Sequence, residues 1–344
     1  MGEYHATAIY RILDANLDRA REGLRVIEEW CRFGLNQAQD AQACKQMRQE
    51  LAAWHRDELR AARDTPGDRG TTLSHPGEAS RLSLEHLLRA NFSRVQEALR
   101  VLEEYGKLDQ PAMAQACKQM RYQVYTLESR LLDGLRPQQL AQAQLYLVTS
   151  PAPNLVEIVA AALRGGLRLV QYRDKQGGDR QQLAQARQLC QLCHEHGALF
   201  LVNDRVDLAL AVQADGVHLG QEDVPVAVAR QVLGPRRLVG QSTTNPEELQ
   251  RAIAEGADYV GVGPVYATPT KPDKAAAGLD YVRYAAQHCP LPWYAIGGLG
   301  PDNLPEVIAA GATRVAVVRA LMAAADPQQV AHQLTAVLKR ANHD

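Results

Sequence analysis

The sequence predicts an α/β chain in two parts, an all-helical domain with an internal repeat followed by an eight-stranded parallel (β/α)8 barrel. Three observations support this prediction. The 344 residues are about twice the length of a common single domain. Residues 1–132 carry helical patterns throughout, rich in Ala, Gln, Arg, Glu and Leu. From residue 145 onward, short apolar strands alternate with helical segments, which is typical of parallel βα units.

The helical domain, residues 1–132, contains an internal repeat. Leu13–Glu29 aligns with Leu88–Glu104, and the motif Cys44-Lys-Gln-Met-Arg48 returns at Cys117–Arg121. In both copies the apolar positions step by four and three, which places one apolar stripe along each helix (13, 17, 20, 24, 27 and 88, 92, 95, 99, 102). We therefore expect two helical hairpins that pack these stripes together as a small bundle.

A second set of repeated positions is polar, and packing does not require it. These residues step by three along each helix: Asn16, Arg19, Glu22, Arg25 and Glu28, with Asn91, Arg94, Glu97, Arg100 and Glu103. Two interpretations stay open, a solvated ladder of ion pairs that stabilises little or an Arg/Glu cluster at the pseudo-twofold axis that binds an anion. The turn-rich loop 63–71 is either a functional loop or a plain connector.

The barrel prediction begins after the segment 133–144, whose Gly, Pro and Gln-rich run predicts a linker. We expect strands at 145–149, 168–173, 198–203, 216–219, 237–241, 259–263, 293–297 and 314–318, and a last helix from about 326 to 341. Eight strands in βα order close a TIM barrel, and residues 145–344 are near its lower size limit of roughly 200 residues. Active sites of this fold lie at the carboxyl ends of the strands.

Charged and amide residues gather at the ends of the second, third and fourth predicted strands. They are Gln171, Arg173, Lys175, Asn203, Asp204 and Asp223. The first three alternate along the chain, so they share one side of their strand. An Arg-x-Lys at a strand end is a weak signal alone, but carboxylates beside cations at one rim suit Mg²⁺ bridging a phosphorylated ligand.

The later strand ends add hydroxyl groups, a cation and glycines, namely Ser242, Thr268, Thr270, Lys271 and Gly298. Glycines after the seventh strand let backbone N–H groups approach a phosphate, which is the usual phosphate site of this fold. The chain therefore predicts two anion sites. Two such sites and a metal indicate the joining of two phosphorylated molecules with loss of a phosphate group.

Composition excludes several other classes of protein. Lys and Arg number 38 against 39 Asp and Glu, so no net field attracts nucleic acid or a membrane surface. No signal peptide or run of about 18 apolar residues is present, which predicts a cytoplasmic protein. The six cysteines predict buried thiols. Cys190-Gln-Leu-Cys193-His194 matches a haem-attachment pattern but lies in a helical run, so we interpret it as helix core.

The barrel motifs together resemble the thiamine-phosphate synthase family. They are QYRDK at 171–175, ND at 203–204, DGVHLGQED at 215–223, TPTK at 268–271 and IGG at 296–298. The resemblance covers the whole second half. It implies a Mg²⁺-dependent transferase that joins hydroxymethylpyrimidine diphosphate to a thiazole phosphate, or its carboxylated form, and releases pyrophosphate.

The resemblance also implies roles for individual residues. The pyrimidine diphosphate would be held by Gln171, Tyr172, Arg173, Asp174, Lys175, Asn203, Ser242 and Lys271, the metal by Asp204 and Asp223, and the thiazole phosphate by Thr268, Pro269, Thr270 and Gly298. The catalytic candidates are Arg173, Lys175, Ser242 and Lys271, because the departing pyrophosphate charge must be stabilised. His218 is left as either a base or a structural residue. Arg319 stands where the family often has a small residue, and either points outward or contacts phosphate.

The helical half is similar to the N-terminal extension of cyanobacterial members of that family, and to a domain proposed to act as a phosphomethylpyrimidine kinase. Residues 1–132 contain no G-x-x-x-x-G-K-[ST] loop, so a dimerisation or docking module is the other interpretation. For the barrel, the alternatives are a non-catalytic binder of phosphorylated metabolites and another phosphate-binding enzyme such as an isomerase or aldolase. Homo-oligomerisation is left open.

Overall fold

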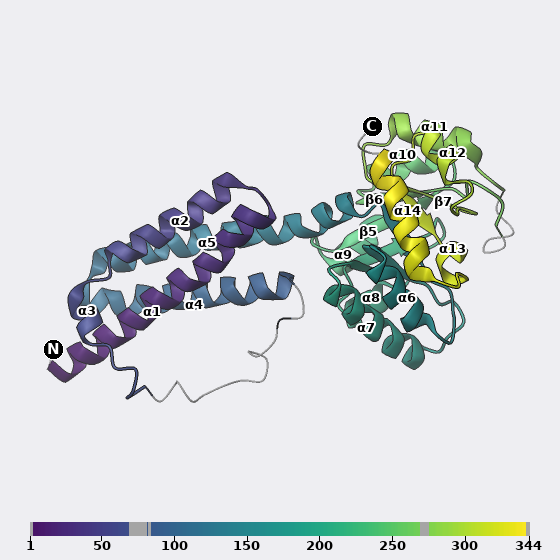
Figure 1. Ribbon diagram of the computed structural model, residues 1–344. Helices are drawn as coiled ribbons and strands as arrows, with labels where there is room; N and C mark the ends of the chain where they lie inside the picture. Colours follow the sequence, from purple (N-terminus) through teal and green to yellow (C-terminus); the bar gives the residue numbers. More distant parts are fainter. Residues whose placement is uncertain (1–2, 69–80, 82–83, 269–274, 342–344) are drawn as a thin grey trace. The chain divides into compact units, whose positions relative to one another are not determined.

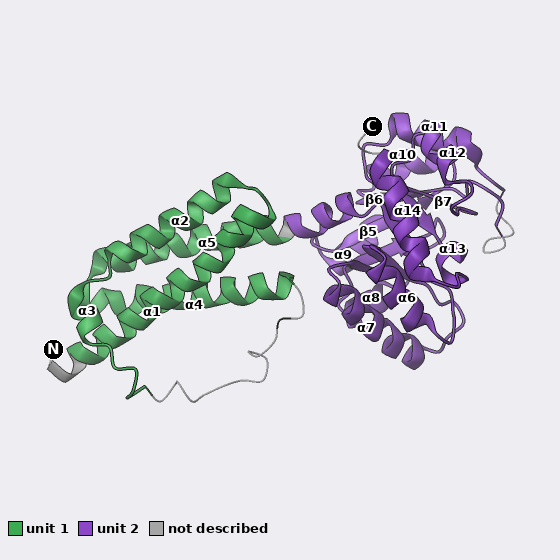
Figure 2. Ribbon diagram, viewed as in Figure 1, with its two compact units in different colours: residues 1–132 green, residues 133–344 purple. Residues whose placement is uncertain are grey.

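The computed structural model describes residues 3–68, 81, 84–268 and 275–341, and it divides into two compact units, residues 1–132 and 133–344 (Figure 2). The unit boundary lies inside helix α5 (Pro111–Gln142). None of the described helices combines the length and the apolar character that a membrane span requires.

The first unit is all-helical (Figure 1). Its elements are α1 (Glu3–Glu29), the π-helical turn η1 (Trp30–Gly34), α2 (Ala38–Ala53), α3 (Asp57–Ala61), α4 (Leu84–Asp109) and the first part of α5. α1 packs against α2 and α4. The ten apolar stripe positions predicted from the repeat are all fully buried: Leu13, Leu17, Ala20, Leu24, Ile27, Leu88, Phe92, Val95, Leu99 and Leu102. The stripes are thus the packing surfaces of this unit.

The repeated polar residues of this unit include ion pairs along each helix, as one of the two interpretations predicts. Arg25 pairs with Glu28 and Glu29, and Arg100 pairs with Glu103 and Glu104. Asn16 and Asn91 are buried, and each Nδ2 donates to a carbonyl four residues earlier in its own helix. Glu28 is buried and accepts from Arg48 at 2.5 Å, and in the second copy Glu103 accepts from Arg121 at 2.9 Å. Each Glu therefore joins the first helix of its hairpin to the second. This pairing gives the recurring Arg of the Cys-Lys-Gln-Met-Arg motif a structural role in each hairpin, and anion binding by the row stays a hypothesis.

The second unit is a closed barrel of eight parallel strands in sequence order. The strands are β1 (Leu145–Val148), β2 (Leu169–Tyr172), β3 (Leu199–Asn203), β4 (Gly216–Leu219), β5 (Leu238–Thr243), β6 (Tyr259–Val262), β7 (Trp293–Ile296) and β8 (Val315–Val317). All eight predicted strands are confirmed to within two residues at each end, and β1 closes the barrel against β8 with Leu145 opposite Val315. The predicted fold class is confirmed.

Helices surround this barrel (Figure 1). They are α6 (Leu155–Arg164), α7 (Asp179–Glu195), α8 (Val206–Ala211), α9 (Val226–Leu233), α10 (Pro246–Ala254), α11 (Gly278–His288), α12 (Leu304–Ala309), α13 (Arg319–Met322) and α14 (Pro327–Ala341). Because strand side chains alternate, one set packs under the helices and the other fills the barrel. The inner set includes three buried tyrosines, Tyr146, Tyr259 and Tyr294, whose rings meet edge to face.

The predicted linker over 133–144 differs from the structure, in which residues 133–142 continue α5 and Pro137 lies inside the helix. Tertiary contacts outweigh the local turn signal. Leu140 is buried in the core inside the barrel, and the hydroxyl of Tyr294 donates to the carbonyls of Leu140 and Ala143. The Arg136 guanidinium bonds to Asp215. These contacts hold the segment against the amino end of the barrel.

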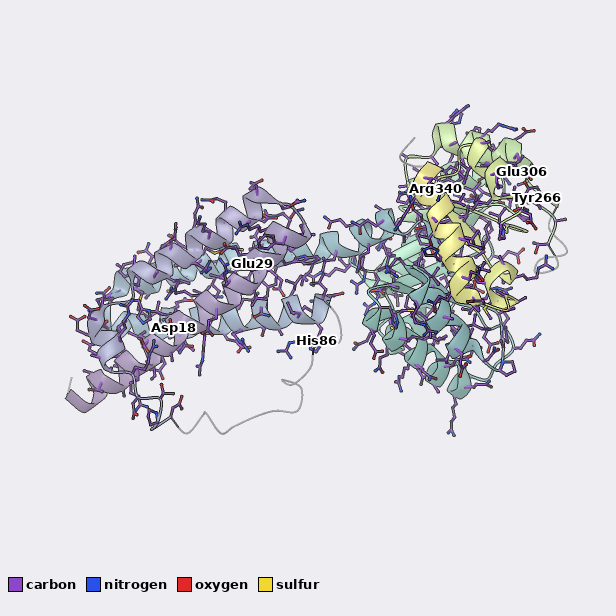
Figure 3. The ribbon with its side chains drawn as sticks, in the orientation of Figure 1. Asp18, Glu29, His86, Tyr266, Glu306 and Arg340 are labelled. Carbon is purple, nitrogen blue, oxygen red and sulfur yellow. The ribbon has the colours of Figure 1, made fainter. Side chains whose placement is uncertain are left out.

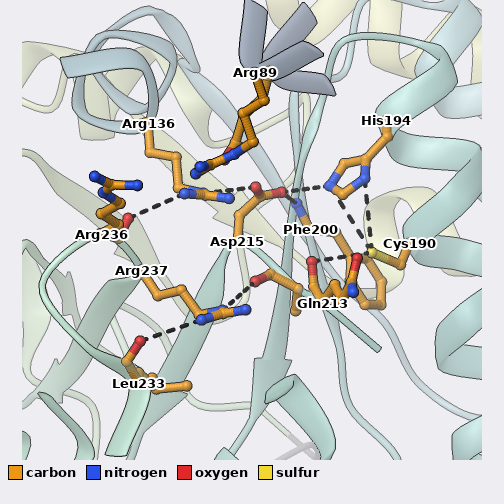
Figure 4. Close-up of polar contacts among 12 residues, drawn as sticks. Arg89, Arg136, Cys190, His194, Phe200, Gln213, Asp215, Leu233, Arg236 and Arg237 are labelled. Atoms are coloured by element: carbon orange, nitrogen blue, oxygen red, sulfur yellow. Dashed lines mark hydrogen bonds and ion pairs between the residues drawn. The ribbon is translucent and has the colours of Figure 1, made fainter. Parts of the chain in front are cut away.

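Asp215, just before β4, is the centre of a buried polar cluster (Figure 4). Its carboxylate accepts from Arg136 Nε, from His194 Nε2 and from the backbone N–H of Phe200, each at 2.9 Å. Burial disfavours the charged His194 ring, but its hydrogen bonds to Asp215 and Cys190 raise its pKa to about 10. Cys190 and Cys193 are buried free thiols of α7, so the haem-attachment pattern is helix core.

Candidate active site

A cavity of about 450 Å³ opens at the carboxyl ends of the strands, a volume within the usual range for small-molecule sites. Tyr146 and Tyr294 of the inner barrel layer are among its lining residues. So are nine of the predicted site residues: Gln171, Arg173, Lys175, Asn203, Asp204, Asp223, Ser242, Thr268 and Gly298. Residues that are far apart in the chain therefore share one chamber, as the barrel topology predicts.

Along β2 and the turn after it, the side chains of the QYRDK motif alternate between the cavity and the opposite face. Gln171, Arg173 and Lys175 line the cavity. Tyr172 instead lies in the core between strands and helices, with its hydroxyl donating to Gln185 of α7 at 3.1 Å. The Asp174 carboxylate is also turned away, because it accepts from two backbone N–H groups of the following turn. The two-residue period of an extended chain explains this division, and it leaves the side chains of Tyr172 and Asp174 outside the cavity.

Two carboxylates and one cation meet at the ends of β3 and β4. Asp204 takes a left-handed backbone conformation (φ 61°), which aspartate tolerates better than most residues. Lys175 Nζ lies 3.1 Å from Asp204 Oδ2, and Asp223 accepts from the backbone N–H of Gly220 at 2.6 Å. Burial and then the neighbouring Asp223 raise the pKa of Asp204, although Lys175 opposes them. A pair of adjacent oxygen ligands of this kind fits a divalent cation.

His218 of β4 has a partner at each ring nitrogen. Nδ1 is 2.9 Å from the hydroxyl of Tyr259, and Nε2 is 2.9 Å from Oγ of Ser242. Tyr259 in turn bonds to the hydroxyl of Tyr146 at 3.1 Å, and Tyr146 accepts from Nε2 of Gln171. A continuous chain of hydrogen bonds thus joins Gln171 to Ser242 through the barrel interior. This arrangement agrees with the structural interpretation of His218 better than with that of a free base.

The opposite side of the cavity is shaped by the turn after β7. Gly298 has a positive φ of 71°, and an added Cβ would lie 2.9 Å from that of Tyr266. Asn303 fixes this turn, because its Nδ2 donates to the carbonyl of Gly298 and its Oδ1 accepts from Gly300. Arg319 begins α13 and is an exposed residue that also lines the cavity. The turn at Gly298 and the guanidinium of Arg319 thus lie where barrels of this fold usually bind a phosphate.

Three predicted residues, Pro269, Thr270 and Lys271, lie outside the described residues. Other contributors were missed by the sequence analysis. Tyr146 supports Gln171, and the hydroxyl of Thr149 accepts from the backbone N–H of Arg173 at 3.0 Å. The regular alternation of side chains in the strands was the available signal for both. Asn303 gave no signal, because only the folded turn brings it to Gly298.

Among the described residues that line the cavity, Lys175 is the only lysine, and it lies beyond the end of β2 with its side chain 57% exposed. A Schiff-base lysine works best in a desolvated pocket, so the aldolase interpretation finds no support in this part of the chain. The cavity combines cations, a carboxylate pair and amides. This combination can bind two anionic groups and stabilise negative charge that develops between them.

Comparisons with known proteins agree with the division into two parts. The family model described as thiamine monophosphate synthase matches residues 145–321, and that of the ThiD2 family matches residues 11–130. A thiamine-phosphate synthase of Nostoc punctiforme is 67% identical over 332 residues, which cover 96% of this chain and 95% of the relative. One from Synechocystis is 62% identical over 342 residues, with 99% and 100% covered.

A solved structure is similar as well. The thiamine phosphate pyrophosphorylase from Pyrococcus furiosus is 38% identical with a TM-score of 0.54. The match covers 59% of this chain and 98% of that chain. Similarity to the solved enzyme thus accounts for a little over half of the chain, whereas the cyanobacterial relatives match nearly all of it.

Proposed function

Since the chain belongs to the thiamine-phosphate synthase family, we propose that its barrel joins hydroxymethylpyrimidine diphosphate to a thiazole phosphate and releases pyrophosphate. The thiazole substrate is the phosphate or its carboxylated form. The observation that carries this proposal is the shared lining of one cavity by the β2 cations and by the carboxylates after β3 and β4. A diphosphate leaving group needs both kinds of group near it.

The pyrimidine diphosphate is assigned to the β2 side of the cavity. Arg173 and Lys175 would neutralise the diphosphate, with Lys271 joining them, and Gln171 and Asn203 would orient the ring. When the carbon–oxygen bond ionises, negative charge grows on the departing pyrophosphate, and fixed cations stabilise that charge more than they stabilise the substrate. The hydroxyl of Ser242, held by His218, adds a directed polar contact.

Asp204 and Asp223 are assigned to Mg²⁺. The raised pKa of Asp204 supports this assignment, because a carboxylate placed beside another carboxylate is relieved when a cation lies between them. When bound, the ion would supply positive charge to the oxygens of the diphosphate. Lys175, which contacts Asp204 at 3.1 Å, would then be released toward the substrate.

The thiazole phosphate is assigned to the turn after β7. Gly298, which lines this side of the cavity and has a positive φ of 71°, would hold the phosphate through its backbone together with Thr268, Pro269 and Thr270. Arg319 lines the same side of the cavity, and we assign it a supporting electrostatic contact. The two substrates then meet above the tyrosine layer, with the leaving pyrophosphate on the β2 side.

The test is to incubate the purified chain with both phosphorylated substrates and Mg²⁺ and to measure thiamine phosphate and pyrophosphate. Equal amounts of the two products are expected, and they should disappear when Mg²⁺ is removed by a chelator. Binding of both substrates without any product would contradict the proposal and favour the non-catalytic binder.

A second candidate function, phosphorylation of the pyrimidine monophosphate, concerns the helical unit. The ThiD2 match over residues 11–130 favours it, and it would let one chain supply its own diphosphate substrate. The same assay with the pyrimidine monophosphate, ATP and the thiazole phosphate tests this candidate. Product formation that stops when ATP is omitted is expected for a bifunctional chain, whereas no product under these conditions would favour a dimerisation or docking role.

A further inference from the structure

The helical unit contains a cluster of charged residues that the proposed barrel reaction does not use. Asp14 and Asp18 lie one turn apart on α1, His55 lies just before α3, and Arg63 lies just after it (Asp18 is labelled in Figure 3). One possible ligand atom from each of Asp14, Asp18 and His55 can be chosen so that all three lie within 4.8 Å of one another. Three separate segments of the chain thus meet at this point.

The imidazole of His55 is buried, with its side chain only 3% exposed. Its Nε2 lies 2.6 Å from Oδ1 of Asp14. In the tautomer that carries the ring proton on Nε2, the other ring nitrogen, Nδ1, offers a lone pair. It is buried and has no hydrogen-bond partner within the part of the chain that the structure describes.

The carboxylate of Asp18 lies close to Nδ1. The distance from His55 Nδ1 to Asp18 Oδ1 is 3.7 Å, which is too long for a hydrogen bond. Two ligand atoms that share a divalent metal ion, each with a bond of about 2.0–2.2 Å, are separated by a distance of this size. Metal-binding histidines also typically donate their other N–H to a carboxylate, and Asp14 is placed to accept such a bond from Nε2 of His55.

The surrounding charges leave the Oδ1 atom of Asp18 as the accessible ligand. Arg63 donates to both oxygens of Asp14 and, at 2.6 Å, to Oδ2 of Asp18. Among the described residues, the hydrogen bond to Oδ1 of Asp18 comes from Arg21 at 3.4 Å, and the Arg21 side chain is one-third exposed. A cation at Oδ1 therefore displaces one weak contact, while Arg63 continues to hold both carboxylates in position.

The internal repeat shows that helix packing does not require this cluster. In the second copy, Arg89 and Ser93 occupy the positions of Asp14 and Asp18. Arg89 pairs with Glu85 and Ser93 bonds to Glu97, both within α4. The two copies bury equivalent apolar stripes, and in the first copy these positions also link different segments of the chain. The cluster is an addition to the shared packing.

We propose that His55 and Asp18 bind a divalent transition-metal cation in the helical unit, with Asp14 as the residue that positions the imidazole. Imidazole and carboxylate together suit first-row ions such as Mn²⁺, Co²⁺ and Zn²⁺. Two protein ligands leave further coordination positions for water or for an anionic ligand. The inference concerns the helical unit alone and does not depend on the reaction proposed for the barrel.

Titration with Co²⁺, followed by its visible absorption, tests this proposal. The starting chain carries Asp204→Asn and Asp223→Asn, so that the barrel carboxylates do not contribute. We expect this chain to bind one equivalent of Co²⁺. Adding Asp18→Asn should weaken binding by about tenfold or more, and His55→Asn should abolish it. The matched control is Glu85→Gln on α4, which makes the same charge change in the second copy and should leave binding unchanged.

The outcomes separate a metal site from an ion-pair cluster. No Co²⁺ binding by the starting chain would overturn the proposal, as would equal affinities for the Asp18→Asn and Glu85→Gln chains. Circular dichroism checks that each variant is folded. If His55→Asn unfolds, the comparison of Asp18→Asn with Glu85→Gln still decides, because both substitutions are on helix surfaces.

Discussion

The two ends of the barrel hold aspartates whose pKa values shift in opposite directions. At the carboxyl end, burial and the neighbouring Asp223 raise the pKa of Asp204. At the amino end, burial also opposes ionisation of Asp215, but the hydrogen bond from His194 and the charges of His194 and Arg136 lower its pKa. Within the described part of the chain, Asp204 has one cationic neighbour, Lys175, and a second carboxylate beside it, whereas Asp215 has two cationic neighbours, Arg136 and His194. The comparison therefore contrasts Asp204, which we propose binds a cation, with Asp215, whose charge is already balanced within the fold.

The largest effect that would test this comparison is expected at the amino end. Asp215→Asn leaves Arg136 and His194 without their buried counter-charge, so we expect the free energy of unfolding to fall by about 3–5 kcal/mol. Chemical denaturation of the variant and of the wild type measures this loss. Turnover per folded molecule should be retained, and a variant as stable as the wild type would contradict the role given to Asp215.

Asp204→Asn should give the opposite result. We expect kcat/KM for pyrophosphate release to fall by about 10²–10³-fold, the usual loss when one group that stabilises developing charge is removed. The free energy of unfolding should stay the same or rise, because an electrostatically disfavoured carboxylate has been removed. Asp207→Asn, at an exposed position on α8 nearby, is the matched control and should leave both quantities unchanged. A lower free energy of unfolding for Asp204→Asn would mean that Asp204, like Asp215, contributes to stability, and would contradict the comparison.

The pH dependence of stability gives a third test. His194 has a pKa of about 10 in the folded chain against an ordinary value of 6.5. Its contribution is therefore fully present below about pH 6.5 and is lost as the pH rises through 10. Because each unit of pKa difference corresponds to about 1.4 kcal/mol, we expect the free energy of unfolding to fall by about 3–5 kcal/mol over this window. A His194→Gln chain should lack that part of the decline, and identical pH profiles would show that the ring is not charged in the folded state.

The smallest effect is expected for Arg319→Ala. Arg319 is exposed, so its electrostatic contribution to thiazole phosphate binding is screened and should be at most about 1 kcal/mol. KM for the thiazole phosphate should rise by about fivefold or less, with kcat unchanged. Steady-state kinetics at two salt concentrations measures it. No change in KM at low salt would mean that Arg319 makes no contact with the phosphate.

Local patterns were enough to predict most of the barrel and its rim. Alternation alone separates Gln171, Arg173 and Lys175 from Tyr172 and Asp174, and it does so in the structure. Local patterns give the wrong secondary structure where tertiary contacts outweigh them. Residues 133–142 carry the turn signals Gly134 and Pro137, yet they are helical because Leu140 and Arg136 have partners on the barrel.

Other parts of the site depend on distances that no local pattern contains. Asn303 reaches Gly298 only because the turn after β7 folds back. His55 and Asp18 are separated by a whole hairpin in sequence, and a histidine in a polar stretch gives no sign of its burial. Lys271, which local pattern and family resemblance both indicate, stays a prediction, since it lies outside the described residues.

The chain of hydrogen bonds through the barrel interior can also carry a direction. The Gln171 amide donates to Tyr146. One proton arrangement that satisfies every contact has Tyr146 donating to Tyr259, Tyr259 donating to Nδ1 of His218, and the ring N–H on Nε2 donating to Ser242. In that arrangement the oxygen of Ser242 is already accepting, so its own proton can be donated to the cavity, which is the polarity that an anionic substrate requires.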